Sequence, residues 1–244
     1  MRIVRPFDPS AVAPGSAGDW LLNLDEGEGV AIRLRRGGGL LELAPATAVE
    51  RFALVIEGTV TLLVAGDEQP ALPGELIFIP SSADSALVAD AKAVWFEIEA
   101  PMTQPAGTAH ASQVIPVDQS RFEGTGFAHQ SLIDRTVGCQ TMRMNVLQVE
   151  SGAGSPNWHI HTFAQIYLIQ EGELTLDVGK HRYIAPANSI VVLPAGVVHR
   201  NFNASPGMER HVSLLVPEPL ESEIFDYAVT IHEVEAELLT AIPA

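Results

Sequence analysis

An internal repeat limits the fold of this 244-residue chain more than any other feature of its sequence. Residues 55–62 read Val-Ile-Glu-Gly-Thr-Val-Thr-Leu, and residues 169–176, which lie 114 positions further on, read Ile-Gln-Glu-Gly-Glu-Leu-Thr-Leu. The same displacement takes Gly74 to Asn188 and Pro80 to Pro194. Two separate segments in one register indicate a tandem duplication, so we expect each half to form its own domain with the same topology.

The halves read as short apolar runs separated by turn residues, which is typical of an all-β protein. The runs at 75–79 and 189–193 each end at a proline, and 20 glycines and 17 prolines are scattered along the chain. This pattern predicts two small barrels or sandwiches. Because residues 101–112 are rich in Pro, Ala, Gly and Thr, we place one domain at 1–108 and the other at 109–244, with a strand at 228–232 and a short C-terminal helix after it.

Charge and hydropathy exclude several classes of partner. The formal net charge is −16, so the long-range field repels nucleic acid and anionic membrane surfaces. No apolar run is long enough for a signal peptide or a membrane span, which together with the single cysteine, Cys139, predicts a cytoplasmic protein without an intrachain disulfide. We expect Cys139 to be a packed core residue.

Four residues of the second half have the spacing of a metal site. His159 and His161 point to the same face if they lie on a strand, because successive side chains alternate. A returning strand can bring Gln165 beside them, and the Pro-Ala-Gly turn at 194–196 can bring in His199. The group predicts one divalent metal ion (Fe, Mn, Zn, Ni or Co, with Fe favoured), with Gln165 either a ligand or a residue that orients a ligand water.

The same displacement indicates that only the second half carries this site. The counterparts of the four candidate ligands are Pro45, Thr47, Arg51 and Ser85, and none of these is a good metal ligand. The first domain is therefore predicted to act as a stabilising partner, an oligomerisation surface or a lid.

These motifs resemble those of the cupin superfamily, specifically a bicupin with one degenerate domain. The first family motif, G-x5-H-x-H-x3-E-x6-G, is matched by His159, His161 and Gly172, with Gly154 one residue too close and Gln165 at the glutamate position. The second, G-x5-P-x-G-x2-H-x3-N, is matched at four positions and has Asn188 in place of its first glycine. The four matching residues are Pro194, Gly196, His199 and Asn203.

The resemblance implies two jelly-roll barrels, a metal ion and, as is common in the family, a homodimer. It does not define a reaction, because cupins include dioxygenases, decarboxylases, isomerases, lyases and non-enzymatic binding proteins. Gln165 removes one negative charge from the expected ligand set, so an anionic small molecule such as a 2-keto acid, enolate or catecholate should bind more strongly. Gentisate dioxygenases, which this chain resembles in the motif only, also work with three histidines and no carboxylate.

Two further residues are candidates for catalysis. Tyr167 lies on the same strand face as Gln165 and is expected either to bond a substrate or transfer a proton, or to be a core aromatic residue. Arg143 shares one face of the strand at 140–149 with Asn145 and Leu147. It can bind a substrate carboxylate if that face points inward, and it is solvated if the opposite face does. The remaining histidines, which lack partner spacing, are expected to be structural or exposed. They are His110, His129, His181, His211 and His232.

Three functions are consistent with these observations. The favoured one is an iron-dependent dioxygenase that acts on a small oxygenated or carboxylated molecule. A second is a metal-dependent isomerase or lyase in which Tyr167 or a metal-bound water handles the proton. The third is a non-catalytic small-molecule-binding or sensor protein, which the missing ligands in the first half support.

Overall fold

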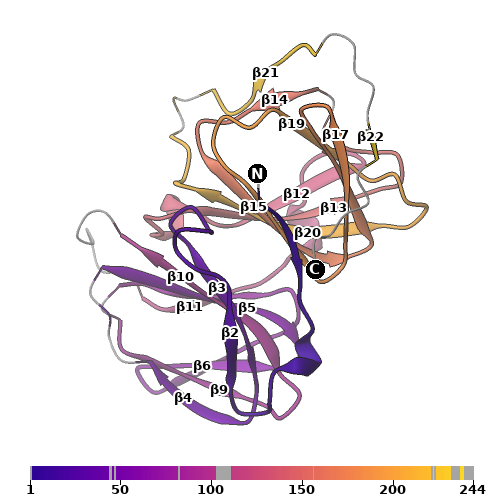
Figure 1. Cartoon of the computed structure of the whole chain (residues 1–244). Coiled ribbons are helices and arrows are strands. Elements are labelled where there is room, and N and C mark those ends of the chain that lie inside the picture. The colour runs from indigo at the N-terminus through magenta and orange to yellow at the C-terminus, as the bar shows by residue number, and fades with distance from the viewer. Residues whose placement is uncertain are drawn as a thin grey trace. The chain divides into compact units, whose positions relative to one another are not determined.

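The structure is a computed structural model in which nearly all of the regular secondary structure is β-strand (Figure 1). It describes residues 2–43, 46, 48–81, 83–102, 111–155, 157–220, 222, 224–231 and 237–238. These residues form 22 strands and three short 3-10 helices, which confirms the all-β prediction. The expected C-terminal helix falls largely outside the described residues, and Glu237–Leu238 within it forms the strand β22. No helix in the described ranges is long and apolar enough to cross a membrane.

The chain divides into two compact units, which we call the first and second units after the repeat that each contains. The first unit comprises Asp8–Val117 and Leu132–Thr141. The second unit comprises Met1–Phe7, Asp118–Ser131 and Met142–Ala244. The 3-10 helices are η1 (Pro9–Ala11), η2 (Gln119–Arg121) and η3 (Arg135–Val137).

The first unit contains a six-stranded and a four-stranded antiparallel sheet. In spatial order, the larger sheet contains β11 (Gln113–Ile115), β8 (Leu76–Ile79), β5 (Val49–Glu57), β10 (Val94–Pro101), β3 (Ala31–Arg36) and β2 (Ala17–Leu22). The smaller sheet contains β4 (Gly39–Leu43), β9 (Ser85–Ala89), β6 (Val60–Val64) and β7 (Asp67–Ala71).

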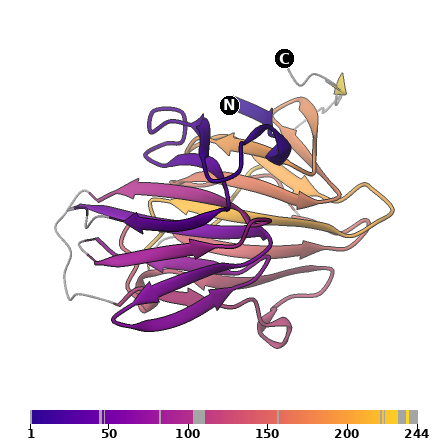
Figure 2. The same cartoon turned by 90° about the horizontal axis from the view of Figure 1, so that it is seen from below.

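The second unit contains two six-stranded sheets, whose long strands are also visible in Figure 2. One sheet contains β1 (Arg2–Pro6), β18 (Ser189–Leu193), β15 (Ala164–Glu171), β20 (Glu209–Val216), β13 (Arg143–Val149) and β12 (Phe127–Ile133). The other contains β21 (Tyr227–Ala228), β14 (His159–Ile160), β19 (His199–Phe202), β16 (Glu173–Val178), β17 (His181–Pro186) and β22.

The turns that mark the repeat in the sequence require the same backbone geometry in both units. Gly58 and Gly172 have φ angles of 70° and 74°, in the left-handed region that favours glycine. A Cβ atom at Gly172 would lie 2.5 Å from a backbone carbonyl oxygen, so a side chain is excluded there. Asn188, which replaces the motif glycine, has a φ of 64° where its counterpart Gly74 has 90°. Asparagine tolerates this conformation better than most residues, which explains the substitution.

The strand at the start of each repeat pairs with a strand of the other repeat. β1 pairs with β18, with Arg2 opposite Val192, and β11 pairs with β8, with Gln113 opposite Phe78. Since positions 78 and 192 are 114 apart, the two edge strands occupy equivalent places. Each compact unit is thus completed by a strand from the start of the other repeat.

The interior of the first unit is an apolar core, and its described residues contain no group of potential metal ligands. Trp95, Val55 and Leu62 belong to its cluster of buried apolar side chains. Of the counterparts of the candidate ligands, Arg51 makes an ion pair with Glu99 and Ser85 bonds Ser112, while residues 45 and 47 lie outside the described ranges. Cys139 is buried in this unit, as expected.

Candidate metal site

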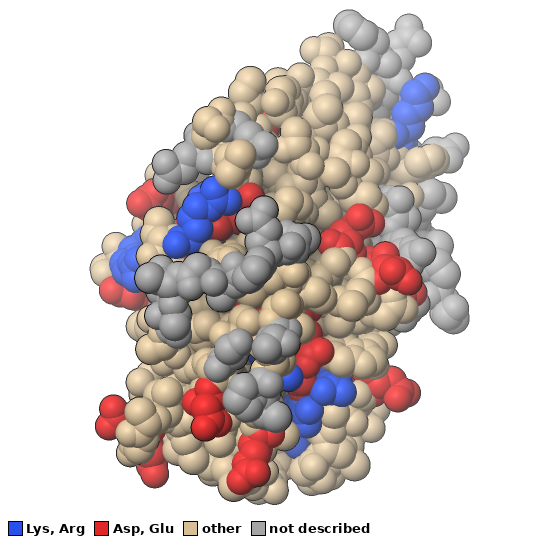
Figure 3. Space-filling view, turned by 90° about the vertical axis from the view of Figure 1, so that its left-hand side faces the viewer, with Lys and Arg blue, Asp and Glu red and all other residues tan. Residues whose placement is uncertain are grey.

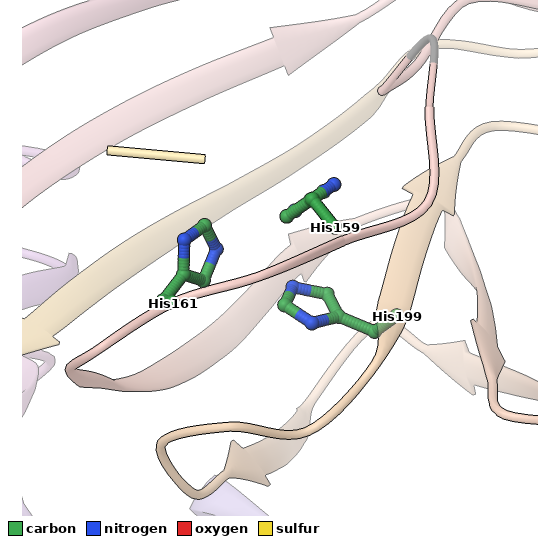
Figure 4. Close-up of side chains that lie close together, drawn as sticks. All are labelled: His159, His161 and His199. Atoms are coloured by element: carbon green, nitrogen blue, oxygen red, sulfur yellow. The ribbon is translucent and has the colours of Figure 1, made fainter. Parts of the chain in front are cut away.

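Three histidine side chains of the second unit converge on one point (Figure 4). One ring nitrogen from each of His159, His161 and His199 lies within 4.8 Å of the others. All three side chains are buried. His159 on β14 lies directly opposite His199 on β19, so cross-strand pairing brings together residues that are 40 positions apart in the sequence.

A backbone carbonyl orients each of these rings. The Nδ1 atoms of His159, His161 and His199 donate hydrogen bonds of 2.9 Å to the carbonyl oxygens of Asn157, Phe225 and Val197, respectively. A carbonyl oxygen only accepts, so the proton of each ring is on Nδ1 and the lone pair is on Nε2. Metal-binding histidines are typically oriented in this way.

The turn of the second motif is attached to the first motif through the backbone. Gly196 has a φ of 78°, and its N–H donates a 2.9 Å hydrogen bond to the carbonyl oxygen of His161. The N–H of Val197 closes the turn on the carbonyl oxygen of Pro194. This link explains why a glycine occurs three residues before His199.

Gln165, at the start of β15, directs its amide oxygen toward the cluster. Its Oε1 lies 3.2 Å from Nε2 of His199 and accepts a 2.8 Å hydrogen bond from the Tyr167 hydroxyl, while its Nε2 donates to Ser213 Oγ at 3.1 Å. The Tyr167 side chain is buried and its hydroxyl is satisfied. Gln165 and Tyr167 share a face that points into the unit, as alternation along the strand predicts.

Burial favours the neutral form of two of the histidines, His161 and His199. Burial lowers the pKa of His199 to about 3, and the neighbouring His159 and His161 act in the same direction, against the raising effect of the Val197 carbonyl. Burial also lowers the pKa of His161, although the Phe225 carbonyl and Asp226 oppose the change. The lone pairs are therefore available to a metal ion at neutral pH.

Two observations fit a cation at this point. The Nε2 atom of His161 is buried and makes no hydrogen bond within the described part of the chain. Nε2 of His199 and Oε1 of Gln165 are both acceptors, yet they face each other at 3.2 Å. An ion bound among these atoms would satisfy all three, and imidazole nitrogens with an amide oxygen suit a divalent transition metal.

A segment near the C-terminus covers one side of the cluster. Residues Tyr227 and Ala228 of β21 pair with β14, and the Phe225 ring packs against His161 and Phe163. Asp226 Oδ1 lies 3.3 Å from Nδ1 of His161. No motif spacing in the sequence connects this segment to the histidines.

The cluster opens on a cavity of about 160 Å³. Most of its lining comes from the strands of the second unit. The lining residues include Asn145, Leu147, Tyr167, His211, Ser213 and Phe225, and among the described lining residues there is no Lys or Arg.

The structure brings the four predicted metal ligands and Tyr167 together but not Arg143. Asn145 and Leu147 line the cavity, so their face of β13 points inward. Arg143 does not line it, and its guanidinium lies 3.5 Å from the buried carboxylate of Glu218. The face of β13 that carries Arg143 therefore points inward, but Arg143 itself does not reach the cavity.

His211 is fully buried and lines the cavity. The sequence, which predicts a structural or exposed histidine at this position, does not place it beside the candidate metal site. The available signal was the alternation of Glu209, His211 and Ser213 on one face of an otherwise apolar strand. His129 also lines the cavity but is exposed, His181 is exposed, and residues 110 and 232 lie outside the described ranges.

Asn203 stabilises a turn, as its motif position predicts. Its amide donates to the carbonyl oxygens of Val149 and Gly207 and accepts from Ser205.

On the face shown in Figure 3, Lys and Arg side chains lie singly or beside Asp and Glu rather than in a continuous basic patch. This distribution agrees with the net charge of −16.

Comparison with known proteins gives a consistent result. Residues 145–214 match the family model described as "Cupin domain", and no curated protein matches the sequence. An IolB-like protein from Salmonella typhimurium is similar in structure, with a TM-score of 0.70, 11% identity and coverage of 94% of this chain and 97% of that chain. A mutant of oxalate decarboxylase from Bacillus subtilis has a TM-score of 0.68 and 12% identity, with coverage of 93% and 79%. A mutant of salicylate 1,2-dioxygenase from Pseudoaminobacter salicylatoxidans has a TM-score of 0.64 and 12% identity, with coverage of 80% and 73%.

The fold and the histidine cluster define a protein with two jelly-roll domains and a candidate metal centre in the second. The segment that matches the cupin domain model contains both histidine motifs, and the similar solved structures share the fold of the whole chain. At these identities the solved structures establish the fold and not the reaction.

Proposed function

We propose that the protein is a metal-dependent enzyme that acts on a small oxygenated or carboxylated molecule, and that its reaction is oxidative cleavage by an iron-dependent dioxygenase. The observation that carries this proposal is the convergence of three buried histidines, each oriented by a carbonyl, beside a cavity that the neutral amide of Gln165 also lines. A purely structural cluster would leave buried ring nitrogens without partners, which is costly.

His159, His161, His199 and Gln165 would hold the ion. When bound, a divalent metal supplies a Lewis acid for an anionic oxygen and, if it is iron, a centre for reaction with O2. The Tyr167 hydroxyl holds the Gln165 oxygen toward the cluster, and Phe163 and Phe225 keep water from His161. Because the ligands are all neutral, an anionic substrate balances the charge of the site, and this anion preference needs no basic side chain.

Arg143 has a smaller part in this proposal than the sequence suggests. Its guanidinium is engaged by Glu218, so we assign substrate anion binding to the metal centre. A salicylate 1,2-dioxygenase and an oxalate decarboxylase have similar folds, which supports a small carboxylated or phenolic substrate. A cytoplasmic location, a homodimer and domain limits at 108 and 109 stay predictions.

Metal analysis and oxygen uptake test the proposal. We expect one divalent ion per chain after anaerobic loading with Fe(II), and oxygen consumption with at least one member of a panel of diphenols and 2-keto acids. The variant His199→Ala should lose the metal, whereas His181→Ala, at an exposed histidine of β17, should keep it. Metal bound without oxygen uptake would remove the dioxygenase reaction. Oxygen-independent turnover with Zn(II) or Ni(II) would instead support an isomerase or lyase, which the proton-handling groups Tyr167 and His211 make chemically feasible.

A further inference from the structure

A second pair of titratable side chains, Glu209 and His211, lies on β20 in the second unit. Both are 0% exposed. Nδ1 of His211 donates to the Glu209 carboxylate, with both oxygens at 2.9 Å. Nε2 of His211 is buried without a hydrogen-bond partner in the described ranges, and the ring lines the cavity of the candidate metal site.

The pair is close to the candidate ligands but is not part of the histidine cluster. The His211 ring lies edge-on to Tyr167, with centroids 5.0 Å apart, and Tyr167 bonds Gln165. Ser213, two residues along the same strand, accepts the hydrogen bond of the Gln165 amide. His211 therefore lines the cavity with a ring nitrogen that has no partner among the described residues, whereas Tyr167 and Ser213 are both bonded to Gln165.

The first repeat shows that packing does not require a polar pair at this position. In the second unit, His211 lies opposite Ile169. In the first unit, the counterpart of Ile169 is Val55, and the residue opposite Val55 is Trp95, which therefore takes the place of His211. Trp95 belongs to the apolar core of the first unit. Burying a carboxylate and an imidazole at the same place costs free energy that an apolar side chain would not, so a role in chemistry accounts for the pair better than a role in packing.

We infer that His211, held by Glu209, accepts a proton from the hydroxyl group of a small substrate bound at the candidate metal centre. The inference rests on the proposed function and adds a catalytic residue to it. In this step the substrate O–H bond breaks, an Nε2–H bond forms on His211, and the electron pair stays on the substrate oxygen. The Nδ1 proton remains with the ring, and the carboxylate beside it stabilises the imidazolium that forms.

Several other titratable groups face the same cavity and contribute to its pH dependence. They are Tyr167 on β15, His129 on β12, the candidate ligands His159 and His161, and Asp226 before β21. Tyr167 is a poor proton acceptor from substrate, because its hydroxyl already donates to Gln165 and burial raises its pKa. His129 is exposed at the edge of the cavity, whereas His211 combines full burial with a carboxylate partner.

The test uses the full chain loaded with Zn(II) and the probe 4-nitrocatechol, whose visible absorption reports its ionisation state. We expect the wild-type protein to bind the probe in a more ionised form than free probe at the same pH. The variant His211→Asn should keep its zinc, bind the probe at least about tenfold more weakly, and need a higher pH to ionise it. Glu209→Gln should weaken binding less, because the imidazole remains but its tautomer is no longer enforced. His181→Asn is the matched control and should behave as wild type.

Nitrogen NMR of histidine-labelled protein provides a measurement that is independent of the probe. In wild type the His211 proton should reside on Nδ1, and in Glu209→Gln it should redistribute toward Nε2. The same spectra show whether each variant is folded.

Four results would overturn the inference. Equal probe binding and ionisation in wild type and His211→Asn would do so, as would a His211 proton found on Nε2 in wild type. Zinc-loaded wild type that does not bind the probe would also overturn it for hydroxyl substrates while leaving the proposed metal site intact. Failure of wild type to bind zinc, read by metal analysis, would overturn the proposed function as well, so the two failures are distinguishable.

Discussion

Replacing Tyr167 by Phe removes one hydroxyl from the candidate metal site and leaves the aromatic ring in place. The hydroxyl donates a 2.8 Å hydrogen bond to Gln165 Oε1, and the Tyr167 side chain is buried. A typical hydrogen bond of this kind contributes about 1 kcal/mol to the free energy of unfolding. Because Gln165 is half-buried, water replaces part of the lost interaction, and we expect a loss near that value.

For a chain of this size, about 1 kcal/mol corresponds to a fall of roughly 2–4 °C in the melting temperature of the metal-free protein. The effect on metal binding should be larger, because the hydroxyl is the group that holds the Gln165 oxygen toward His199. Partners that orient a ligand typically change metal affinity by about ten- to a hundredfold. We therefore expect Tyr167→Phe to weaken Zn(II) binding within that range.

Competition with a chromophoric chelator measures the zinc affinity, and calorimetry of the metal-free protein measures its stability. The control is Tyr183→Phe, at a partly buried tyrosine of β17 whose hydroxyl makes no hydrogen bond in the part of the chain that the structure describes. If Tyr167→Phe binds zinc as tightly as Tyr183→Phe, the hydroxyl does not orient Gln165 and this reasoning is wrong.

Three further predictions concern pH, backbone geometry and domain structure. Burial alone would raise the pKa of Asp177, but hydrogen bonds from Arg182 and Arg200 outweigh burial and lower the pKa. The carboxylate therefore stabilises the fold fully above about pH 4, and this stabilisation is lost as the pH falls through the pKa of the folded state. Asp177→Asn should therefore flatten the acid limb of the unfolding free energy against pH, and an unchanged limb would contradict the assignment. Gly172→Ala should lower the free energy of unfolding by about 1–3 kcal/mol in denaturant titrations, because the φ of Gly172 is 74° and a Cβ would lie 2.5 Å from a carbonyl oxygen. The control is Gly179→Ala, which should lower it less, because Gly179 has a φ of 55° and open space around it. A fragment of residues 109–244 lacks β1 and leaves the edge of β18 unpaired, so it should melt at a lower temperature than the second unit of the full chain, and equal melting would show that β1 is dispensable.

Much of the candidate site follows from local sequence pattern. The displacement of 114 between repeats reappears in the strands, for instance in the equivalent turns at Gly58 and Gly172. The pair His159 and His161 and the alternation of Gln165 with Tyr167 depend only on the period of a strand, which any extended segment obeys. These features can be predicted from the sequence because residues that are close together in the chain determine them.

The rest of the candidate site depends on which strands, distant in the sequence, pair with each other. His211, which bonds Glu209, reaches the cavity because β20 lies beside β15. The carbonyl of Phe225 orients His161 because β21 pairs with β14, where Ala228 lies opposite His159, 69 positions earlier in the chain. Arg143 has the expected face but meets Glu218, a residue that no local spacing connects with it.

The duplication, the strand pattern, the histidine motifs and the loss of ligands from the first repeat can all be read from the sequence. Three features appear only in the folded chain: edge strands are exchanged between repeats, a buried imidazole held by a carboxylate lines the cavity, and a C-terminal segment holds one of the candidate ligands. The physical reason is one of range. Alternation and turn geometry act over a few residues, whereas pairing between strands distant in sequence is selected by the packing of the whole unit.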